Sequence, residues 1–191
     1  VDAVAAEDTR HSQKLLDAFG ISTRLVALHE HNEQAAAGQV IRMLEEGRHV
    51  ALITDAGTPA VSDPGARAVA RIQEAGFPVV PVPGACAAIA ALSASGLADG
   101  HFHFHGFLPT KSAARKAQLD ALRSVPGTLV FYEAPHRILE CLEDMQAVFG
   151  DVGQSQAHFR PTAFQRIEQR GFFAAHISTI AMMRKQVEAE L

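Results

Sequence analysis

The sequence predicts an α/β protein made of two α/β domains. Short apolar runs rich in β-branched residues alternate with segments of helical length, and several of these runs end in loops of small or polar residues. Strands that alternate with helices in this way form parallel sheets. With 191 residues, of which 48% are hydrophobic, the chain is long enough to bury a sizeable core.

The first domain is expected to span residues 1–96. Gly20, Gly47 and Gly76 follow three helical segments and are typical helix ends. Asn32 is a good N-cap for the second of these helices. The expected strands are 1–6, 24–28, 49–54 and 78–82. The expected helices are 11–19, the segment between Asn32 and Gly47, 64–75, and one that begins after Pro83-Gly84 and runs to Leu92.

The second domain is expected to span residues 101–191, after a short polar connection at Gly96–Gly100. Its predicted strands are 101–105 and 128–132, and its predicted helices are 112–123 and 135–149. Residues 152–170 are polar and irregular. A final helix at 177–191 is expected because three apolar side chains there share one helical face.

The whole chain is organised around the stretch from residue 49 to residue 65. Its apolar run, 49–54, predicts a buried parallel strand, and the small residues that follow allow a backbone to approach a ligand closely. Asp63 is the expected N-cap of the next helix, with Pro64 at the first helical position. The loop is either a ligand site at the carboxyl edge of the sheet or an ordinary strand-to-helix turn.

A second ligand candidate lies at Pro83–Leu92, where a strand ends and a helix of small residues begins. The N-terminus of a helix offers unpaired N–H groups and the positive end of a dipole. The alternative is a buried helix packed tightly against the sheet.

Charge and composition narrow the function classes. The net charge of −4 disfavours broad nucleic-acid binding, so any RNA contact must be a local patch. Lys111, Arg115, Lys116 and Arg123 form the most basic segment, which is either a phosphate-contacting patch or a solvated helix face. No apolar run is long enough to span a membrane, and two cysteines favour a reducing compartment.

Two histidine-containing clusters remain. His101, His103 and His105 share one face of a strand, but no further ligand completes a metal site, so we expect an exposed or subunit-facing surface and no metal. Glu133, His136 and Arg137 follow the strand 128–132. They either contact a nucleotide or form a helix cap with an ion pair.

Five segments together resemble the tetrapyrrole methylase superfamily, and within it the methyltransferases of ribosomal RNA. The order and separation of the segments match, and the likeness runs from Val1 to about Gly150. After Gly150 the family's further strands are not matched, and its first strand and Gly-Asn loop would precede Val1, so the N-terminal strand is expected to be missing. The five segments are Ala6–Arg10, His29–Asn32, Asp55–Gly65, Val82–Ala88 and Phe131–Arg137.

The resemblance implies that S-adenosylmethionine binds in a cleft between the two domains. The G-x-G-x-x-G fingerprint of Rossmann methyltransferases is absent, as it is in this superfamily. Backbone groups and small side chains of the two loops would hold the cofactor. The residues implied are Asp55, Ala56, Gly57, Thr58, Pro59, Val61, Pro83, Gly84, Ala85, Cys86, Ala87 and Tyr132.

The implied reaction is 2′-O-methylation of a cytidine in small-subunit (16S) ribosomal RNA by a cytoplasmic homodimer. A ribose hydroxyl needs a base or a field that favours the alkoxide, and no single base is assigned. Two alternatives stay open: a methylase of tetrapyrroles, and a truncated, non-catalytic form of the fold. The candidate bases are Glu7, Asp8, His29, Glu133 and His136, and the RNA-contacting candidates are Arg10, Lys111, Arg115, Lys116 and Arg137.

Overall fold

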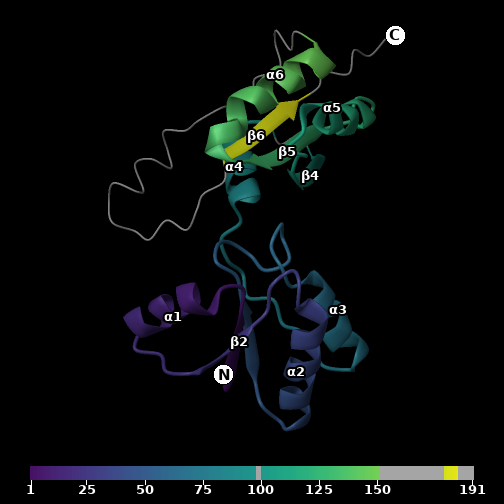
Figure 1. Cartoon of the computed structure of the whole chain (residues 1–191). Helices are drawn as coiled ribbons and strands as arrows, with labels where there is room; N and C mark the ends of the chain where they lie inside the picture. Colours follow the sequence, from purple (N-terminus) through teal and green to yellow (C-terminus); the bar gives the residue numbers. More distant parts are fainter. Residues whose placement is uncertain (98–99, 151–178, 185–191) are drawn as a thin grey trace. The chain divides into compact units, whose positions relative to one another are not determined.

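A computed structural model of the protein describes residues 1–97 and 100–150, and the backbone of residues 179–184. The chain divides into two compact units, Val1–Cys86 and Ala87–Leu191 (Figure 1). This division falls earlier in the chain than the connection expected at Gly96–Gly100. The domain ranges 1–96 and 101–191 stay a prediction.

The first unit is built on a parallel sheet with strand order β2-β1-β3. The connection from β1 to β2 runs in the opposite direction along the sheet to that from β2 to β3. Because such crossovers are right-handed, their helices cover opposite faces, and Figure 1 shows α1 on one side and α2 on the other. The elements are β1 (Ala3–Ala6), α1 (Thr9–Ala18), β2 (Arg24–Ala27), α2 (Glu33–Glu45), β3 (Val50–Ile53) and α3 (Ala66–Glu74).

Strand β3, which precedes the loop that begins at Asp55, is less buried than β1. All four residues of β1 are buried, because β1 has a partner on each side, whereas every residue of β3 is half-buried. The prediction of a buried strand at 49–54 is therefore wrong in its burial, although the strand itself is present. Among the described residues, β3 lies at an edge of its sheet.

The strand predicted at 78–82 is absent, and this prediction is wrong. The segment has no regular structure, and Val80 and Val82 are 79% and 84% exposed. Prolines at 78, 81 and 83 lack the N–H donors that a sheet ladder requires, so β-branched residues alone do not make a strand here.

Helix α3 begins later than predicted. Its N-cap is Gly65, with φ of 130°, so Asp63 does not cap the helix and Pro64 is not its first residue. The cap comes instead from Glu33 of α2, whose Oε2 accepts hydrogen bonds from the backbone N–H groups of Arg67 (3.0 Å) and Ala68 (3.3 Å). A carboxylate at a helix N-terminus satisfies unpaired donors and interacts favourably with the dipole.

The second unit contains a sheet of order β4-β5-β6, in which β4 and β5 are parallel and β6 is antiparallel to β5. Helices α5 and α6 pack on one face of β5 around a core that includes Leu119, Phe131 and Met145. The elements are α4 (Ala87–Ser95), β4 (Phe102–Phe107), α5 (Ser112–Ala121), β5 (Thr128–Glu133), η1 (Pro135–Arg137), α6 (Ile138–Phe149) and β6 (Thr179–Arg184).

The helix expected after Pro83-Gly84 begins at Ala87. One prediction for the second unit needs correction. Residues 179–184 form a strand rather than the helix expected at 177–191, because they pair with β5 along its whole length. The irregular segment expected at 152–170 lies outside the described residues. Within the described part of the chain, no helix is long and apolar enough to cross a membrane.

Candidate functional site

The carboxyl edge of the first sheet gathers three of the segments that the sequence singled out. Strand β1 runs into Glu7 and Asp8, β2 leads to His29, and β3 leads to Asp55. The three strands are parallel, so their ends meet at one edge, which is where open α/β sheets bind ligands.

Reciprocal hydrogen bonds join the ends of β1 and β3. The backbone N–H of Asp8 donates to Oδ1 of Asp55, and the backbone N–H of Asp55 donates to Oε2 of Glu7, both at 3.3 Å. Each acidic side chain therefore fixes the backbone of the opposite loop. Asp63 lies in the same electrostatic environment: its own burial, followed by the charges of Glu7 and Asp55, raises its pKa to about 6.

The loop that follows β3 is tightly folded. Ala60 and Ser62 have φ of 68° and 64°, a conformation that residues other than glycine rarely adopt and that costs about 1–3 kcal/mol each. Two internal bonds hold this shape, from the N–H of Ala60 to the carbonyl of Pro64 and from the N–H of Val61 to the carbonyl of Thr58 (both 3.2 Å). Strained backbone conformations of this kind occur frequently at ligand sites.

The two cofactor segments expected in this unit lie against each other. The Thr58 hydroxyl donates to the carbonyl of Ala85 at 2.8 Å. Gly57 has φ of 80°, and a Cβ added there would stand 3.7 Å from the same carbonyl oxygen. The surrounding residues, Ala56, Gly57, Gly84 and Ala85, are small and exposed. Such a cradle of accessible backbone fits a ligand with carboxylate and hydroxyl groups, as S-adenosylmethionine has.

The structure gives the candidate bases of this unit different roles. The Asp8 carboxylate caps α1 by accepting from the N–H groups of Arg10 (2.8 Å) and His11 (3.2 Å), and these bonds lower its pKa. His29 is half-buried, and its backbone N–H donates to Oδ1 of Asn32. Asn32 occupies the N-cap position of α2 but uses its side chain to hold the His29 turn.

The predicted residues of the second unit cluster at the end of β5. Glu133 is fully buried and binds Arg137 through Oε1, which accepts from Nε of Arg137 at 2.8 Å and from its Nη2. His136 is exposed and Arg137 is half-buried. The hydroxyl of Tyr132 accepts a hydrogen bond from the N–H of Ala88 (3.2 Å), in the first turn of α4. The ion-pair alternative for this cluster is therefore realised in the structure.

The basic segment divides into buried and exposed groups. The Arg115 side chain is 1% exposed, and its Nε lies 2.6 Å from Oδ2 of Asp144. This placement contradicts an RNA-contacting role for Arg115, because its guanidinium is buried and forms an ion pair with the Asp144 carboxylate. Lys111 is exposed, and Lys116 is half-exposed with its Nζ 3.2 Å from Oδ1 of Asp144. Arg123 pairs with Asp120 at 3.6 Å.

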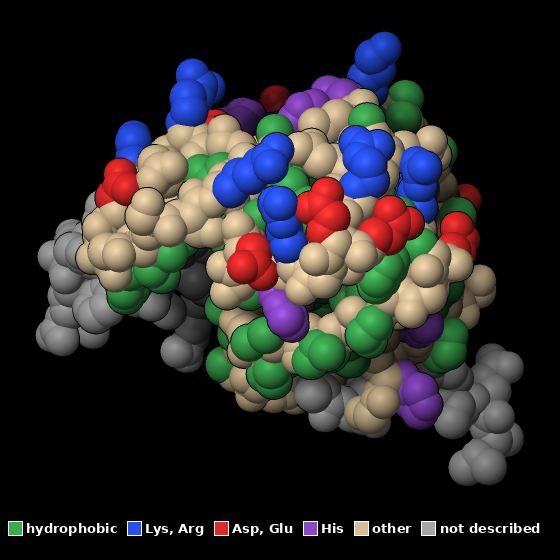
Figure 2. All heavy atoms as spheres, turned by 90° about the horizontal axis from the view of Figure 1, so that it is seen from below, with side chains coloured by type: hydrophobic (Ala, Val, Ile, Leu, Met, Phe, Trp, Pro, Cys, Tyr) green, Lys and Arg blue, Asp and Glu red, His purple; other side chains and the backbone are tan. Residues whose placement is uncertain are grey.

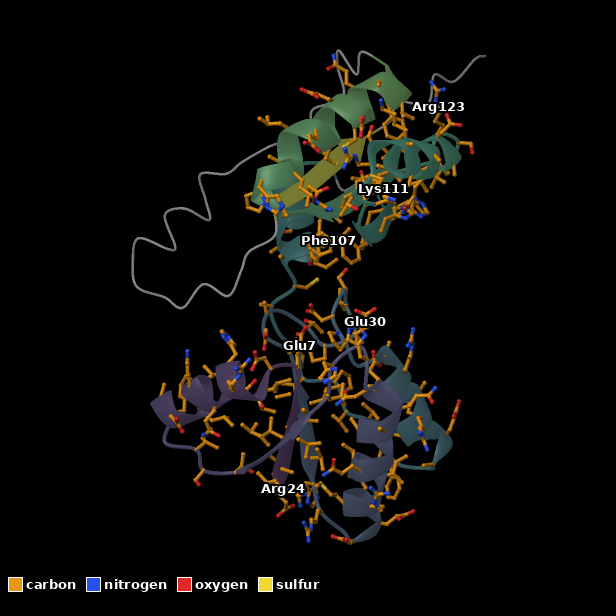
Figure 3. All side chains as sticks on the ribbon, in the orientation of Figure 1. Glu7, Arg24, Glu30, Phe107, Lys111 and Arg123 are labelled. Carbon is orange, nitrogen blue, oxygen red and sulfur yellow. The ribbon has the colours of Figure 1, made fainter. Side chains whose placement is uncertain are left out.

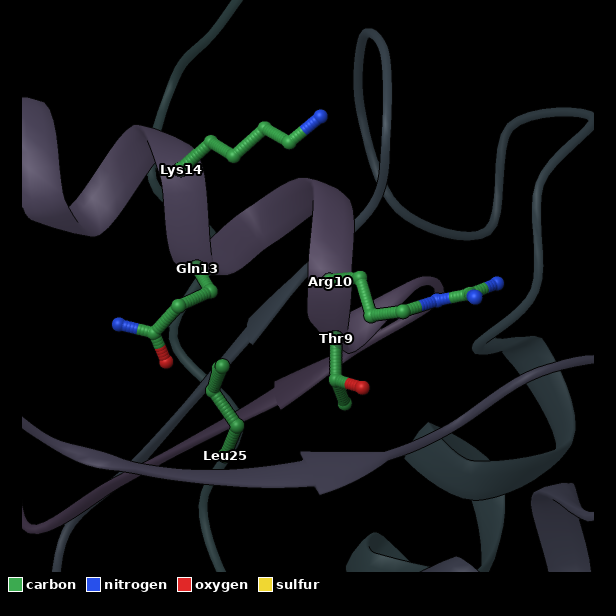
Figure 4. A pocket seen from close by; sticks show the side chains of 5 residues that line it. All are labelled: Thr9, Arg10, Gln13, Lys14 and Leu25. Atoms are coloured by element: carbon green, nitrogen blue, oxygen red, sulfur yellow. The ribbon is translucent and has the colours of Figure 1, made fainter.

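An open hollow of about 480 Å³ lies beside α1 (Figure 4). Arg10 and Lys14 line it together with Thr9, Gln13 and Leu25, and none of the predicted cofactor residues does. The face of the protein drawn in Figure 2 carries Lys and Arg side chains together with Asp and Glu.

The histidines of β4 have separate environments. His103 Nε2 lies 3.0 Å from the carbonyl oxygen of Pro126, while the ring of His105 stacks on Phe131 at 5.5 Å. Burial, followed by the charge of His103, lowers the pKa of His105. Among the residues that the structure describes, no group of three or more His, Cys, Asp or Glu side chains is placed to hold a metal ion.

Sequence reasoning missed two contributors to these sites. Asp63 was expected only as a cap, and Glu33 was not singled out. A third carboxylate within the organising loop was a visible signal for Asp63. The role of Glu33 depends on a contact between helices, so no local pattern could have indicated it.

The fold and the site define a class: an α/β protein with small-residue loops at the carboxyl edge of a parallel sheet, suited to bind a small ligand. The chain belongs to the tetrapyrrole (corrin/porphyrin) methylase family, whose sequence model matches residues 1–183. That match extends beyond the stretch from Val1 to about Gly150 on which the resemblance rested.

Curated relatives share high identity with the chain. It is 58% identical over 150 residues to ribosomal RNA small subunit methyltransferase I of Pseudomonas aeruginosa, covering 78% of this chain and 53% of that protein. It is 54% identical over 151 residues to the protein of the same name from Escherichia coli O157:H7, covering 79% and 53%. The chain therefore spans about half the length of the curated relatives it matches.

Solved structures support the fold. The methyltransferase CobJ has a TM-score of 0.59 at 19% identity, covering 97% of this chain and 85% of that one. Diphthine synthase has a TM-score of 0.56 at 16% identity, covering 98% and 80%. At these identities the likeness concerns the fold alone, and it confirms the predicted α/β class.

Proposed function

We propose that the protein is an S-adenosylmethionine-dependent methyltransferase that methylates the ribose 2′-hydroxyl of a cytidine in small-subunit (16S) ribosomal RNA. Its identity to relatives named for the small-subunit RNA supports the substrate class. One structural observation carries the proposal: the bond from the Thr58 hydroxyl to the carbonyl of Ala85, which joins two of the family's segments into one cradle.

When bound, S-adenosylmethionine supplies a sulfonium methyl group that an oxygen nucleophile can displace. In the first unit, small side chains let the backbone approach such a ligand, and the bonds of Glu7 and Asp55 fix the loop in place. The proposed cofactor residues are Asp55, Ala56, Gly57, Thr58, Pro59, Val61, Pro83, Gly84, Ala85 and Cys86. Ala87 and Tyr132, which belong to the second unit, stay predicted cofactor residues.

The ribose hydroxyl is a weak nucleophile, so a base or an oriented field must accompany positioning. Asp8 and Glu133 are the less suitable bases, because Asp8 is occupied as a helix cap and Glu133 is paired with Arg137. Glu7, His29 and His136 remain candidates for holding the proton. Within the first unit, Glu7 accepts a hydrogen bond from the backbone N–H of Asp55, the first residue of the loop.

For RNA, we propose phosphate contacts by Arg10, Lys111 and Lys116, with Arg137 as a further candidate. Arg10 and Lys111 are exposed, as groups that contact phosphates must be. We also propose that the protein acts as a homodimer in the cytoplasm. The free cysteines Cys86 and Cys141 agree with a reducing compartment, and light scattering of the eluted protein tests the dimer.

Calorimetric titration with S-adenosylmethionine and its demethylated product tests cofactor binding directly. Transfer of a labelled methyl group to small ribosomal subunits, followed by nucleoside analysis, then tests the reaction. Binding with transfer to a cytidine 2′-oxygen is the expected result. Transfer to a tetrapyrrole but not to RNA would replace the substrate, and absence of cofactor binding by folded protein would overturn the enzymatic assignment of this chain.

A further inference from the structure

An exposed aromatic side chain that is not among the predicted cofactor residues stands at the end of the second sheet. Phe107 closes β4 and is 46% exposed. Its ring lies 5.6 Å from the ring of Tyr132 at an interplanar angle of 61°, and Phe104 contacts the same ring at 4.8 Å. Edge-to-face contacts of this kind hold a ring in a fixed orientation.

A break in strand register places Phe107 there. Strict alternation along β4 would put Phe107 on the face of His105, which stacks on Phe131. The pairing of β4 with β5 shifts between Phe104 and Phe107, and Gly106 between them has φ of 62°. Phe107 is thereby paired with Tyr132 and turned to its face. Such irregularities re-aim side chains and are common beside functional sites.

A cation follows closely in the chain. Lys111 is exposed at the N-cap position of α5, four residues after Phe107, so their Cα atoms are at most about 14 Å apart. Figure 3 labels both residues, Phe107 at the end of β4 and Lys111 where α5 begins. An exposed ring held at a fixed angle next to a lysine is the combination that binds single-stranded nucleic acid, through base stacking and phosphate contact.

We propose that Phe107 is a stacking platform for an unpaired base of the RNA substrate, with Lys111 contacting a neighbouring phosphate. This inference rests on the proposed function, since it assigns a recognition residue for the same substrate. Phe107 is a positioning residue for RNA and takes no part in the methyl transfer itself.

The test is fluorescence anisotropy of a labelled single-stranded cytidine-containing RNA titrated with wild type and variants. Phe107→Ala should weaken binding about 5- to 150-fold, the range measured for loss of one stacked base. Phe107→Leu, which keeps apolar bulk without an aromatic face, should weaken it nearly as much, and Phe107→Trp should retain it. Phe102→Ala is the matched control, because Phe102 lies on the same strand and is 43% exposed.

Parallel titrations with S-adenosylmethionine, together with light scattering, test whether the Phe107 ring contacts the cofactor or a second copy of the chain instead. Unchanged RNA affinity in Phe107→Ala, with wild type binding RNA, would overturn this inference and leave the proposed function standing. Loss of cofactor affinity without loss of RNA affinity would overturn it in favour of a cofactor contact. A change of oligomeric state would overturn it in favour of a subunit contact. Failure of wild type to bind this RNA would overturn the inference about Phe107, whereas methyl transfer to small ribosomal subunits decides the proposed function separately.

Discussion

Replacing Gly57 by valine perturbs the proposed cofactor cradle at one backbone position. A Cβ there would already stand at van der Waals distance, 3.7 Å, from the carbonyl oxygen of Ala85. The two γ-methyl groups of valine must then either clash with that carbonyl, which accepts a hydrogen bond from the Thr58 hydroxyl, or fill the open side of the loop. Either outcome removes space or geometry that a ligand needs. We therefore predict that Gly57→Val abolishes S-adenosylmethionine binding.

The cost to folding can be separated from the cost to binding. A β-branched residue at φ of 80° is strained by about 1–2 kcal/mol, which is less than the stability of a typical domain. Gly76 has φ of 87°, and a Cβ there would meet no atom within 4 Å. Gly76→Val therefore carries the same backbone strain without touching the loop, and it serves as the matched control.

Urea unfolding measures the stability of the two variants, and calorimetry measures their affinity for S-adenosylmethionine. Both should lose similar stability, and only Gly57→Val should lose cofactor affinity, by more than the tenfold that corresponds to about 1.4 kcal/mol. If Gly57→Val binds the cofactor as wild type does, the loop is not the cradle. If Gly76→Val loses affinity equally, strain acts through folding and the loss in Gly57→Val does not identify the loop as the cradle.

Charged groups give three further predictions. Because the pKa of Asp63 is raised to about 6, the folded state binds more protons than the unfolded state between pH 3.8 and about 6. The free energy of unfolding therefore falls as the pH rises through this range. Asp63→Asn should resist urea better than wild type above pH 6 but not below pH 3.8. Asp144→Ala should lower the free energy of unfolding by about 3–5 kcal/mol, because it removes the carboxylate 2.6 Å from buried Arg115 and leaves it with the exposed Glu140, at 3.9 Å. A loss below about 1 kcal/mol in urea unfolding contradicts this. Lys111→Glu should weaken RNA binding and reduce its salt dependence, whereas Arg48→Glu, at an arginine paired with Glu46, should change neither in the same anisotropy titrations.

Local patterns were sufficient for most elements of the fold. The strands before Glu7, His29 and Asp55 and the helices between them follow from apolar periodicity and from glycine at helix ends, and these signals are local. Which loops meet was not predicted. Parallel strands share a carboxyl edge, and in the structure this brings Glu7, Asp8 and Asp55 within hydrogen-bond distance.

Partners that are distant in sequence account for most of the corrections. The start of α3 depends on Glu33, which lies 34 residues before the N–H of Arg67 that it caps. The burial of Arg115 depends on Asp144, 29 residues away, and a basic helix gives no sign of that partner. Burial of a strand depends on its neighbours in the sheet, so the apolar run at 49–54 did not reveal that β3 is only half-buried. The missing strand at 78–82 is different, because its prolines were a local signal.

The energetics of the organising loop bear on whether it is a ligand site or an ordinary turn. Positive φ at Ala60 and Ser62 costs about 1–3 kcal/mol each, and burial, followed by the charges of Glu7 and Asp55, raises the pKa of Asp63. The bonds that hold the loop contribute only about 0.5–1.5 kcal/mol each. A connection from strand to helix needs none of this strain, since an unstrained turn joins the same elements. A loop that keeps a costly shape beside exposed small residues is better explained by a shape required for a ligand, and this supports the proposal that the loop holds the cofactor.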